Sequence, residues 1–177
     1  EPLAGDEPLA VLLPDAMIRH HGPGALAQMT EVYQRTGASV IGVKEVPAEW
    51  TSSYGIVGVR ESEQGDMAIE TMVEKPAPQD APSRLGVVGR YVLDSSVFGH
   101  LRKVQAGAGG EIQLTDGIAA MLDTHRVLAL PLQGERFDCG SRHGFIKATI
   151  EYAMDDDEIR EEMLDHMLGL LARTGRL

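Results

Sequence analysis

An acidic and a basic side chain stand next to each other at Glu74 and Lys75, where an apolar, β-rich stretch ends at Pro76. A carboxylate accepts hydrogen bonds from hydroxyl groups, and a lysine ammonium is a compact point charge suited to phosphate oxygens. The pair therefore suits a ligand with a hydroxyl beside a phosphate, such as a sugar phosphate. A motif this short also fits two solvated charges at an exposed strand end, so its surroundings have to decide.

The composition limits the classes of partner. The chain has 177 residues, 43% of them hydrophobic, which is enough for one substantial core. Its 27 acidic and 16 basic residues give a net charge of −11, and the basic residues form no cluster, which argues against a nucleic acid partner. No apolar run approaches the roughly 20 residues that span a bilayer, and no signal peptide is evident. With a lone cysteine, Cys139, this predicts a cytoplasmic protein without a membrane partner.

Strands and helices alternate along the first part of the chain, which predicts an α/β fold. Residues 9–13 form an apolar run ended by Pro14, typical of a strand covered on both faces in a mainly parallel sheet, and Asp15 follows its carboxyl end. A helix from about Leu26 to Gly37 then leads into a second strand at 38–46. The order strand, helix, strand predicts a right-handed crossover.

The middle of the chain is richer in strands. Segments at 56–59, 68–74 and 85–93 suggest a smaller β-rich layer over the main sheet. The segments expected after them are a short helix at 95–103, a loop at 107–110, a helix over 112–122, a strand at 126–132, a helix capped by Ser141 that ends near Met154, and a C-terminal helix over about 155–173. Because no repeat or linker divides the chain, we predict a single domain over 1–177.

Seven short segments together carry a resemblance to a known family. They are Gly5-Asp6-Glu7-Pro8, Leu13-Pro14-Asp15, Tyr54-Gly55-Ile56-Val57, Val73-Glu74-Lys75-Pro76, Val88-Gly89-Arg90-Tyr91, Gly110-Glu111-Ile112-Gln113-Leu114-Thr115-Asp116 and Phe137-Asp138-Cys139-Gly140. In this order and spacing the chain resembles the bacterial UTP:glucose-1-phosphate uridylyltransferases, from Gly5 to about Tyr152. The resemblance implies the nucleotidyltransferase fold, a Rossmann-like mixed sheet flanked by helices with a smaller sugar-binding β-layer.

The resemblance also implies roles for the residues around the sugar. It places the glucose hydroxyls at Glu74 and the phosphate of glucose 1-phosphate at Lys75, which makes Lys75 the candidate catalytic residue. The backbone of Tyr54-Gly55 and of Val88-Gly89 would lie against the sugar ring. From the residues alone, Gly55 fits an ordinary turn and Gly89 a strand bulge equally well. We expect Glu111, Thr115 and Asp116 to order a loop or cap a helix, without a direct catalytic task.

Two aspartates far apart in the sequence are implied as ligands of Mg²⁺. Asp15 and Asp138 match the acidic positions of the family, and carboxylates together with phosphate oxygens suit this hard cation. Asp15 also fits the start of a turn, and Asp138 a turn before Gly140.

The activity implied is the joining of UTP and α-D-glucose 1-phosphate to give UDP-glucose and pyrophosphate, by a homodimer or homotetramer. The chain departs from the family pattern because it lacks the glycine-rich loop Gly-x-Gly-Thr-Arg. We therefore expect an incomplete nucleotidyltransferase domain, corresponding to the C-terminal two-thirds, that lacks its nucleotide-binding portion and is inactive alone. A sugar 1-phosphate nucleotidyltransferase that uses dTTP, or a non-catalytic module that binds sugar nucleotides, remains an alternative.

Overall fold

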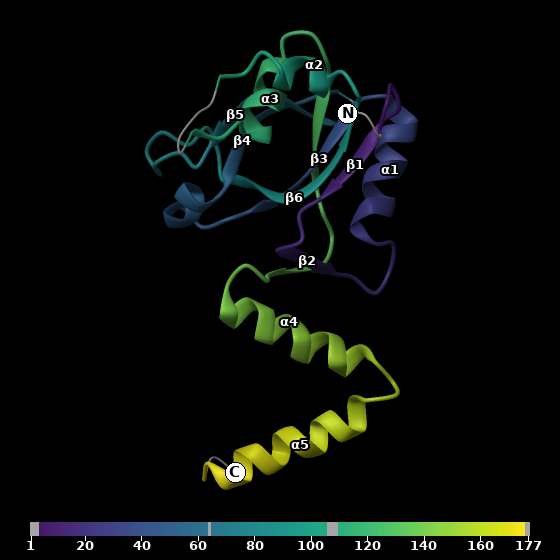
Figure 1. Cartoon of the computed structure of the whole chain (residues 1–177), viewed down its shortest axis with the longest axis vertical. Coiled ribbons are helices and arrows are strands. Elements are labelled where there is room, and N and C mark those ends of the chain that lie inside the picture. Colours follow the sequence, from purple (N-terminus) through teal and green to yellow (C-terminus); the bar gives the residue numbers. More distant parts are fainter. Residues whose placement is uncertain (1–3, 64, 106–109, 176–177) are drawn as a thin grey trace. The chain divides into compact units, whose positions relative to one another are not determined.

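The computed structural model describes residues 4–63, 65–105 and 110–175 (Figure 1). The chain divides into two compact units. Unit 1 comprises Glu1–Leu13 and His20–Gly134, and unit 2 comprises Pro14–Arg19 and Glu135–Leu177. Each unit is described by itself below, because the sugar-binding candidates and the metal-binding candidates fall in different units.

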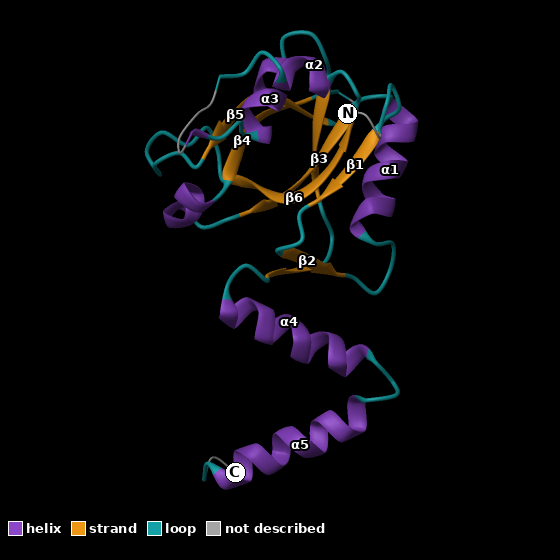
Figure 2. Cartoon of the chain, in the orientation of Figure 1, coloured by secondary structure: helices purple, strands orange, loops and turns teal. Residues whose placement is uncertain are grey.

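Unit 1 is built on one six-stranded sheet. Its strands are β1 (Leu9–Leu12), β3 (Ser39–Glu45), β4 (Gly55–Glu61), β5 (Met67–Glu74), β6 (Leu85–Leu93) and β7 (Val127–Pro131). They follow the order β1-β6-β3-β7-β5-β4, and β4 also pairs with β6, so that five strands close into a ring (Figure 2). The predicted strands are thereby confirmed. The expectation that the middle of the chain forms a smaller layer over the main sheet was wrong for the described strands, because β4, β5 and β6 pair within this one sheet.

The expectation of a mainly parallel sheet was wrong for the strands that the structure describes. Among their pairings only β3 with β7 is parallel, while β6 runs antiparallel to β1, β3 and β4. β1 has a single partner, and its burial alternates along the strand, so that Leu12 is 51% exposed. An apolar run can thus form a strand in which partly buried and exposed residues alternate. The helix that follows connects β1 to β3 across β6, which lies between them.

Four helical segments whose bounds the structure describes complete unit 1. The structure confirms the predicted helix α1 (Ala25–Thr36), which ends at Gly37 in the left-handed conformation with φ 66°. A short 3-10 helix, η1, spans Ala48–Ser53, and two α-helices follow, α2 (Val97–Leu101) and α3 (Leu114–Met121). The loop predicted at 107–110 lies outside the described residues except for Gly110.

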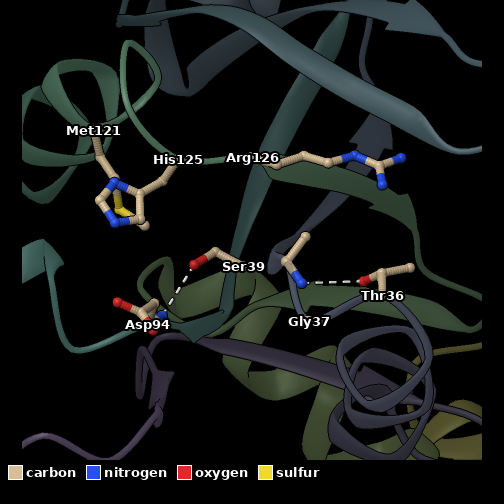
Figure 3. Close-up of a pocket in the computed structure, with 8 residues that line it drawn as sticks. Thr36, Gly37, Ser39, Asp94, Met121, His125 and Arg126 are labelled. Carbon is tan, nitrogen blue, oxygen red and sulfur yellow. Dashed lines mark hydrogen bonds between the residues drawn. The ribbon is translucent and has the colours of Figure 1, made fainter.

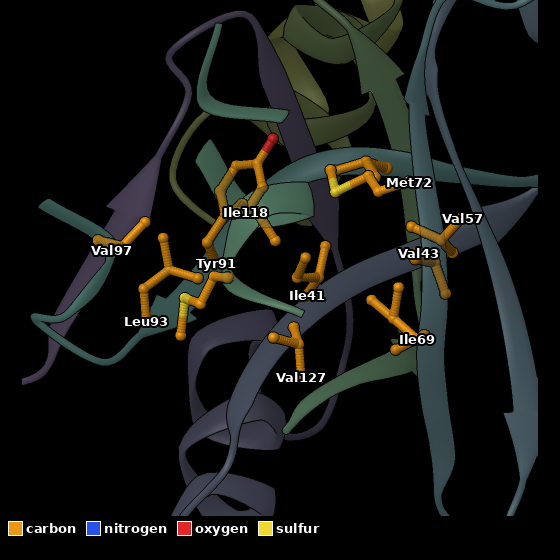
Figure 4. Close-up of a cluster of buried hydrophobic side chains, with 13 residues drawn as sticks. Ile41, Val43, Val57, Ile69, Met72, Tyr91, Leu93, Val97, Ile118 and Val127 are labelled. Carbon is orange, nitrogen blue, oxygen red and sulfur yellow. The ribbon is translucent and has the colours of Figure 1, made fainter. Parts of the chain in front are cut away.

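The largest hydrophobic cluster of unit 1 lies between the sheet and α3 (Figure 4). Ile41, Val57 and Leu93 of the strands are fully buried, as are Ile118 and Met121 of α3. Burial of such side chains stabilises the fold by roughly 1.5–3 kcal/mol each. Since α3 packs on β5, the core fixes the first turn of α3 relative to the end of that strand.

Unit 2 combines a two-stranded ribbon with two helices. The ribbon pairs β2 (Ala16–Arg19) with β8 (Glu135–Asp138), and α4 (Arg142–Asp155) and α5 (Arg160–Arg173) follow. The predicted cap is confirmed, because the Ser141 hydroxyl accepts a hydrogen bond from the Gly144 N–H at 3.0 Å. α5 begins at Arg160 rather than near Asp155. No helix among the described residues is long and apolar enough to cross a membrane.

A single arginine ties the ribbon of unit 2 to α4. The Arg19 guanidinium lies 3.2 Å from the Glu135 carboxylate, 2.7 Å from that of Glu151 and 3.6 Å from that of Asp155. It also lies over the Phe137 ring, 5.9 Å from its centroid. Charges from both the ribbon and the helix thus converge on one side chain, which holds the two together.

Candidate functional site

The pairing of β4 with β5 brings two of the predicted segments together. Gly55 lies opposite Glu74 in the register of these antiparallel strands. One residue further along, the Lys75 N–H donates a hydrogen bond to the Tyr54 carbonyl at 3.0 Å. Tyr54, Gly55, Glu74 and Lys75 therefore form one cluster at the end of the hairpin, although about 20 residues separate them in the sequence.

A threonine from α3 completes this cluster. The Thr115 hydroxyl donates a hydrogen bond to Oε2 of Glu74 at 2.6 Å, and Thr115 itself is only 7% exposed. The other carboxylate oxygen, Oε1, lies 3.6 Å from Nζ of Lys75, whose side chain is 60% exposed. The two oxygens of Glu74 thus face different environments: Oε2 meets a buried hydroxyl and Oε1 an exposed ammonium.

The role expected for Thr115 was therefore incomplete. Sequence reasoning assigned this residue to loop ordering or helix capping, but the N-cap of α3 is Gln113 and Thr115 lies in the first turn. Its hydroxyl is used by Glu74, which is 41 residues away in the sequence. No spacing in the sequence signals such a contact, because the contact depends on how α3 packs on β5.

The cluster leaves little room for a side chain at position 55. A Cβ atom added to Gly55 would lie 3.2 Å from Oε2 of Glu74 and 3.4 Å from Oγ1 of Thr115. The first distance is tighter than most Cβ contacts, so a side chain at position 55 would press on the Glu74 carboxylate and require it to shift by a few tenths of an ångström. The glycine thus leaves its backbone open beside the carboxylate.

The backbone of Lys75 adopts an unusual conformation. Its φ is 45°, in the left-handed region, and no other described non-glycine residue has a positive φ. This conformation costs a residue with a Cβ atom about 1–2 kcal/mol. It ends β5 directly after Glu74, and the buried Pro76 follows it. Strained backbone of this kind clusters at functional sites, and here it follows a charged residue at the end of a strand.

Val88 and Gly89 form a bulge in β6. β6 has three residues between Val87 and Tyr91, where the facing strand β3 has only one between their partners. Gly89 has φ 70°, and a Cβ atom there would lie 3.0 Å from that of Leu13. The structure therefore bears out the bulge, next to the end of β1. β6 also reaches the first cluster, because Gly86 lies against the Tyr54 ring.

The two candidate metal ligands lie side by side within unit 2. Asp138 pairs with Ala16 in the ribbon, and the Cys139 N–H donates to the Asp15 carbonyl at 2.7 Å. Oδ1 of Asp138 and Oδ2 of Asp15 lie 3.3 and 3.6 Å from the point where Gly140 would carry a Cβ atom. Both aspartates are exposed. Residues 123 positions apart are thus neighbours, which the sequence alone did not indicate because the β2–β8 pairing was not predicted.

This pair of carboxylates fits a Mg²⁺ ion that takes its remaining ligands from elsewhere. Among the described residues, no group of three or more histidine, cysteine, aspartate or glutamate side chains is arranged to hold a metal. Mg²⁺ is usually held by one or two carboxylates together with water and substrate phosphates, and does not need a cage of protein ligands. The absent side chain at Gly140 leaves space beside both oxygens.

A separate cavity of about 130 Å³ in unit 1 is lined by none of the predicted site residues (Figure 3). Two of its hydroxyl groups accept backbone hydrogen bonds from other residues of the lining. The Ser39 hydroxyl accepts from the Asp94 N–H at 2.9 Å, and the Thr36 hydroxyl accepts from the Ala38 N–H at 3.2 Å. These bonds join the start of β3 to the ends of α1 and β6, so the cavity has a structural explanation.

Comparison with known proteins identifies relatives of both units. The profile of a family described as nucleotidyl transferase matches residues 2–155. The UTP--glucose-1-phosphate uridylyltransferase of Bacillus subtilis (strain 168) is 45% identical over 167 residues, which cover 94% of this chain and 57% of that protein. The chain therefore spans little more than half the length of this relative.

Solved structures agree with this match. A crystal structure of UDP-glucose pyrophosphorylase complexed with UDP-glucose is similar with a TM-score of 0.82 and 39% identity, covering 88% of this chain and 59% of that one. A UTP-bound UGPase from Acinetobacter baumannii is similar with a TM-score of 0.80 and 38% identity, covering 94% of this chain and 58% of that one. The fold predicted from the sequence, a mixed sheet flanked by helices, is confirmed.

Proposed function

Because this chain belongs to the nucleotidyl transferase family, we propose that the whole protein joins UTP and α-D-glucose 1-phosphate to give UDP-glucose and pyrophosphate. The observation that carries the proposal is the cluster of Glu74, Lys75, Gly55 and Thr115. It combines a fixed hydrogen-bond acceptor, an exposed ammonium and a backbone open to close approach. Relatives named for this reaction, with UDP-glucose or UTP bound in their structures, support it.

Each member of the cluster has a chemical role in this proposal. The carboxylate of Glu74 accepts hydrogen bonds from glucose hydroxyls, and the ammonium of Lys75 binds the phosphate of glucose 1-phosphate. The backbone at Tyr54 and Gly55 lies along the sugar ring. Val88 and Gly89 are proposed as further sugar contacts, with the bulge of β6 turning their backbone out of the regular ladder.

The reaction is a direct displacement at phosphorus. An oxygen from the phosphate group of glucose 1-phosphate forms a bond to the α-phosphorus of UTP. The bond between the α-phosphorus and the oxygen that bridges it to the β-phosphorus breaks, and pyrophosphate leaves. The attacking phosphate is already an anion at neutral pH, so no strong general base is required. Lys75 lowers the repulsion between the two anions and holds the nucleophile in position.

Mg²⁺ is proposed as the cofactor, with Asp15 and Asp138 as the residues that would hold it. Bound there, the ion would supply positive charge to the phosphate oxygens of the nucleotide. The pairing of β2 with β8 would hold both aspartates beside the ion, and substrate phosphates and water would supply its other ligands.

Lys75→Ala is the direct test of the proposal. With UTP, glucose 1-phosphate and Mg²⁺, the unaltered full-length protein should release pyrophosphate, and Lys75→Ala should lower turnover about 100-fold because one stabilising charge is lost. Its unfolding temperature should change little, since the side chain is largely exposed. Lys103→Ala, at an exposed lysine after α2, is the matched control and should retain activity. If the unaltered protein releases no pyrophosphate, the proposed enzymatic activity is refuted and a non-catalytic binding module is favoured.

Three further properties of the whole protein are proposed. We expect one nucleotidyltransferase domain that includes both units, since the family match runs through residues of each. A homodimer or homotetramer is expected, which sedimentation of the full-length protein would test. The cytoplasm, which holds nucleoside triphosphates, is the proposed location, and fractionation of cells would test it.

A further inference from the structure

The hydrogen bond between Thr115 and Glu74 has the geometry of a positioning contact. A carboxylate can only accept, so the Thr115 hydroxyl is the donor, and 2.6 Å is a short distance typical of a bond to a charged group. Thr115 is 7% exposed and lies on a helix anchored in the core. The Thr115 hydroxyl is therefore held in place by its helix, and its hydrogen bond restrains the Glu74 carboxylate.

The bond also separates the tasks of the two carboxylate oxygens. Oε2 is engaged by Thr115 and lies beside Gly55, while Oε1 lies toward the exposed ammonium of Lys75 at 3.6 Å. Without Thr115, the plane of the Glu74 carboxylate could turn about the last side-chain bond, and neither oxygen would keep a fixed place. With it, one oxygen is held at a fixed place next to the phosphate-binding lysine.

We infer that Thr115 is a positioning residue for the sugar subsite: its hydroxyl fixes the Glu74 carboxylate so that Oε1 is held ready for a glucose hydroxyl while Lys75 takes the phosphate. The inference rests on the proposed function. The inference adds to that function a side chain on α3 that affects the affinity for the sugar and need not touch the substrate. Orienting Glu74 before binding lowers the entropy lost when the sugar is bound.

Two substitutions distinguish the effect of the Thr115 hydroxyl from the effect of the shape of its side chain. In the full-length protein, Thr115→Val keeps the branched shape but removes the donor, and should raise KM for glucose 1-phosphate about tenfold, the value of a hydrogen bond to a charged group. KM for UTP should stay within about twofold, since the sugar subsite alone is disturbed. Thr115→Ser keeps the donor and should restore KM for glucose 1-phosphate to within about threefold of the unaltered protein.

Two controls distinguish positioning from a purely structural role. Thr36→Val removes another partly buried hydroxyl, which bonds to the Val32 carbonyl and the Ala38 N–H, and should lower stability without changing either KM. In a Glu74→Ala background, adding Thr115→Val should change KM for glucose 1-phosphate by less than about twofold, because Thr115 acts through Glu74.

The outcomes separate the positioning role from the function on which it rests. Equal changes in both KM values, failure of Thr115→Ser to restore affinity, or a full additive effect in the Glu74→Ala background would overturn the role of Thr115 while the activity stands. Absence of uridylyl transfer by the unaltered protein would overturn both. The inference is supported if Thr115→Val raises KM for glucose 1-phosphate about tenfold more than KM for UTP, and if this difference disappears in the Glu74→Ala background.

Discussion

The acidic groups of the two units are held in different ways. In unit 1, Glu74 is fixed by the side chain of a buried threonine on a helix that the core anchors. In unit 2, Asp15 and Asp138 are exposed and stand on a two-stranded ribbon, where backbone pairing and the Cys139 N–H set their places. The difference suits their proposed ligands, since a sugar hydroxyl needs one oriented acceptor and a metal ion draws flexible carboxylates to itself.

The units also differ in what stabilises them. Unit 1 buries large side chains completely, whereas the buried apolar residues described in unit 2 are Phe137 and three alanines, Ala16, Ala148 and Ala153. Helix α5 has no buried residue in its described length. Charged contacts around Arg19 take a larger share in unit 2. Substitutions of apolar residues should therefore damage unit 1 much more than unit 2.

Ile118→Ala tests this difference with the largest expected effect. Ile118 is fully buried under the sheet, and its truncation should lower the free energy of unfolding by about 3 kcal/mol through lost burial and a residual cavity. Leu168→Ala, at a side chain of α5 that is 52% exposed, should change it by less than about 0.5 kcal/mol. Urea unfolding of the full-length protein measures both. Equal losses would show that α5 is buried as deeply as α3.

Asp138→Asn tests the exposed acids of unit 2. The substitution keeps the size of the side chain and removes its charge, so turnover should fall about 100-fold and require more Mg²⁺, because a metal ligand is weakened. The unfolding temperature should be unchanged, since Asp138 is exposed. Asp165→Asn, at an exposed position of α5, serves as the control. Turnover that depends on Mg²⁺ as in the unaltered protein would refute the assignment of Asp138.

Asp66 is the centre of an ion cluster in unit 1, in which one carboxylate contacts two arginines. The cluster around Arg19 in unit 2 has the opposite arrangement, with one arginine among carboxylates. Its carboxylate lies 2.7 Å from the Arg35 guanidinium and 3.2 Å from that of Arg126. The hydrogen bond from Arg35, assisted by the charge of Arg126 and opposed by burial, holds the pKa of Asp66 below its ordinary value of 3.8. The resulting stability is present above pH 3.8 and is lost as the pH falls through the lowered pKa.

Asp66→Asn should therefore lower the unfolding temperature at neutral pH, by less than Ile118→Ala does. The difference from the unaltered protein should shrink as the pH falls from 3.8 through the lowered pKa of Asp66, because the unaltered carboxyl group is then neutral like the asparagine amide. Thermal unfolding over a pH series measures this, with Asp80→Asn at an exposed carboxylate as the control. A difference that is independent of pH would show that packing of Asp66, and not its charge, stabilises unit 1.

Local patterns made most elements of the fold predictable. The strand at Leu85–Leu93, the helix stop at Gly37 and the cap at Ser141 depend on residues close together in the sequence, and the structure confirms them. The antiparallel surroundings of β1 were not predictable in this way. A short apolar run looks the same whether its neighbours are parallel or antiparallel, because only the pairing partners decide.

The candidate site was predictable where a motif or a hairpin defines it. Glu74 and Lys75 adjoin in the sequence, and the β4–β5 hairpin brings Gly55 opposite them. Thr115 was assigned another role because its contact with Glu74 arises from packing. Likewise the strained backbone of Lys75 leaves no trace in the residue type, since lysine has no preference for the left-handed region.

The strain at Lys75 yields the smallest expected effect and the most local test of how unit 1 holds its site. Lys75→Gly and Lys75→Ala both remove the ammonium and should lose activity alike. At φ 45°, however, glycine avoids the Cβ strain that alanine keeps, so the glycine variant should be more stable by about 0.5 kcal/mol after its greater freedom in the unfolded chain is subtracted.

At Lys44, an exposed strand residue of β3 without a positive φ, the order should reverse. Urea unfolding of the four variants provides the measurement. An alanine variant that is the more stable at position 75 would mean that the backbone there is relaxed, and that the position of the lysine follows from the strand end alone.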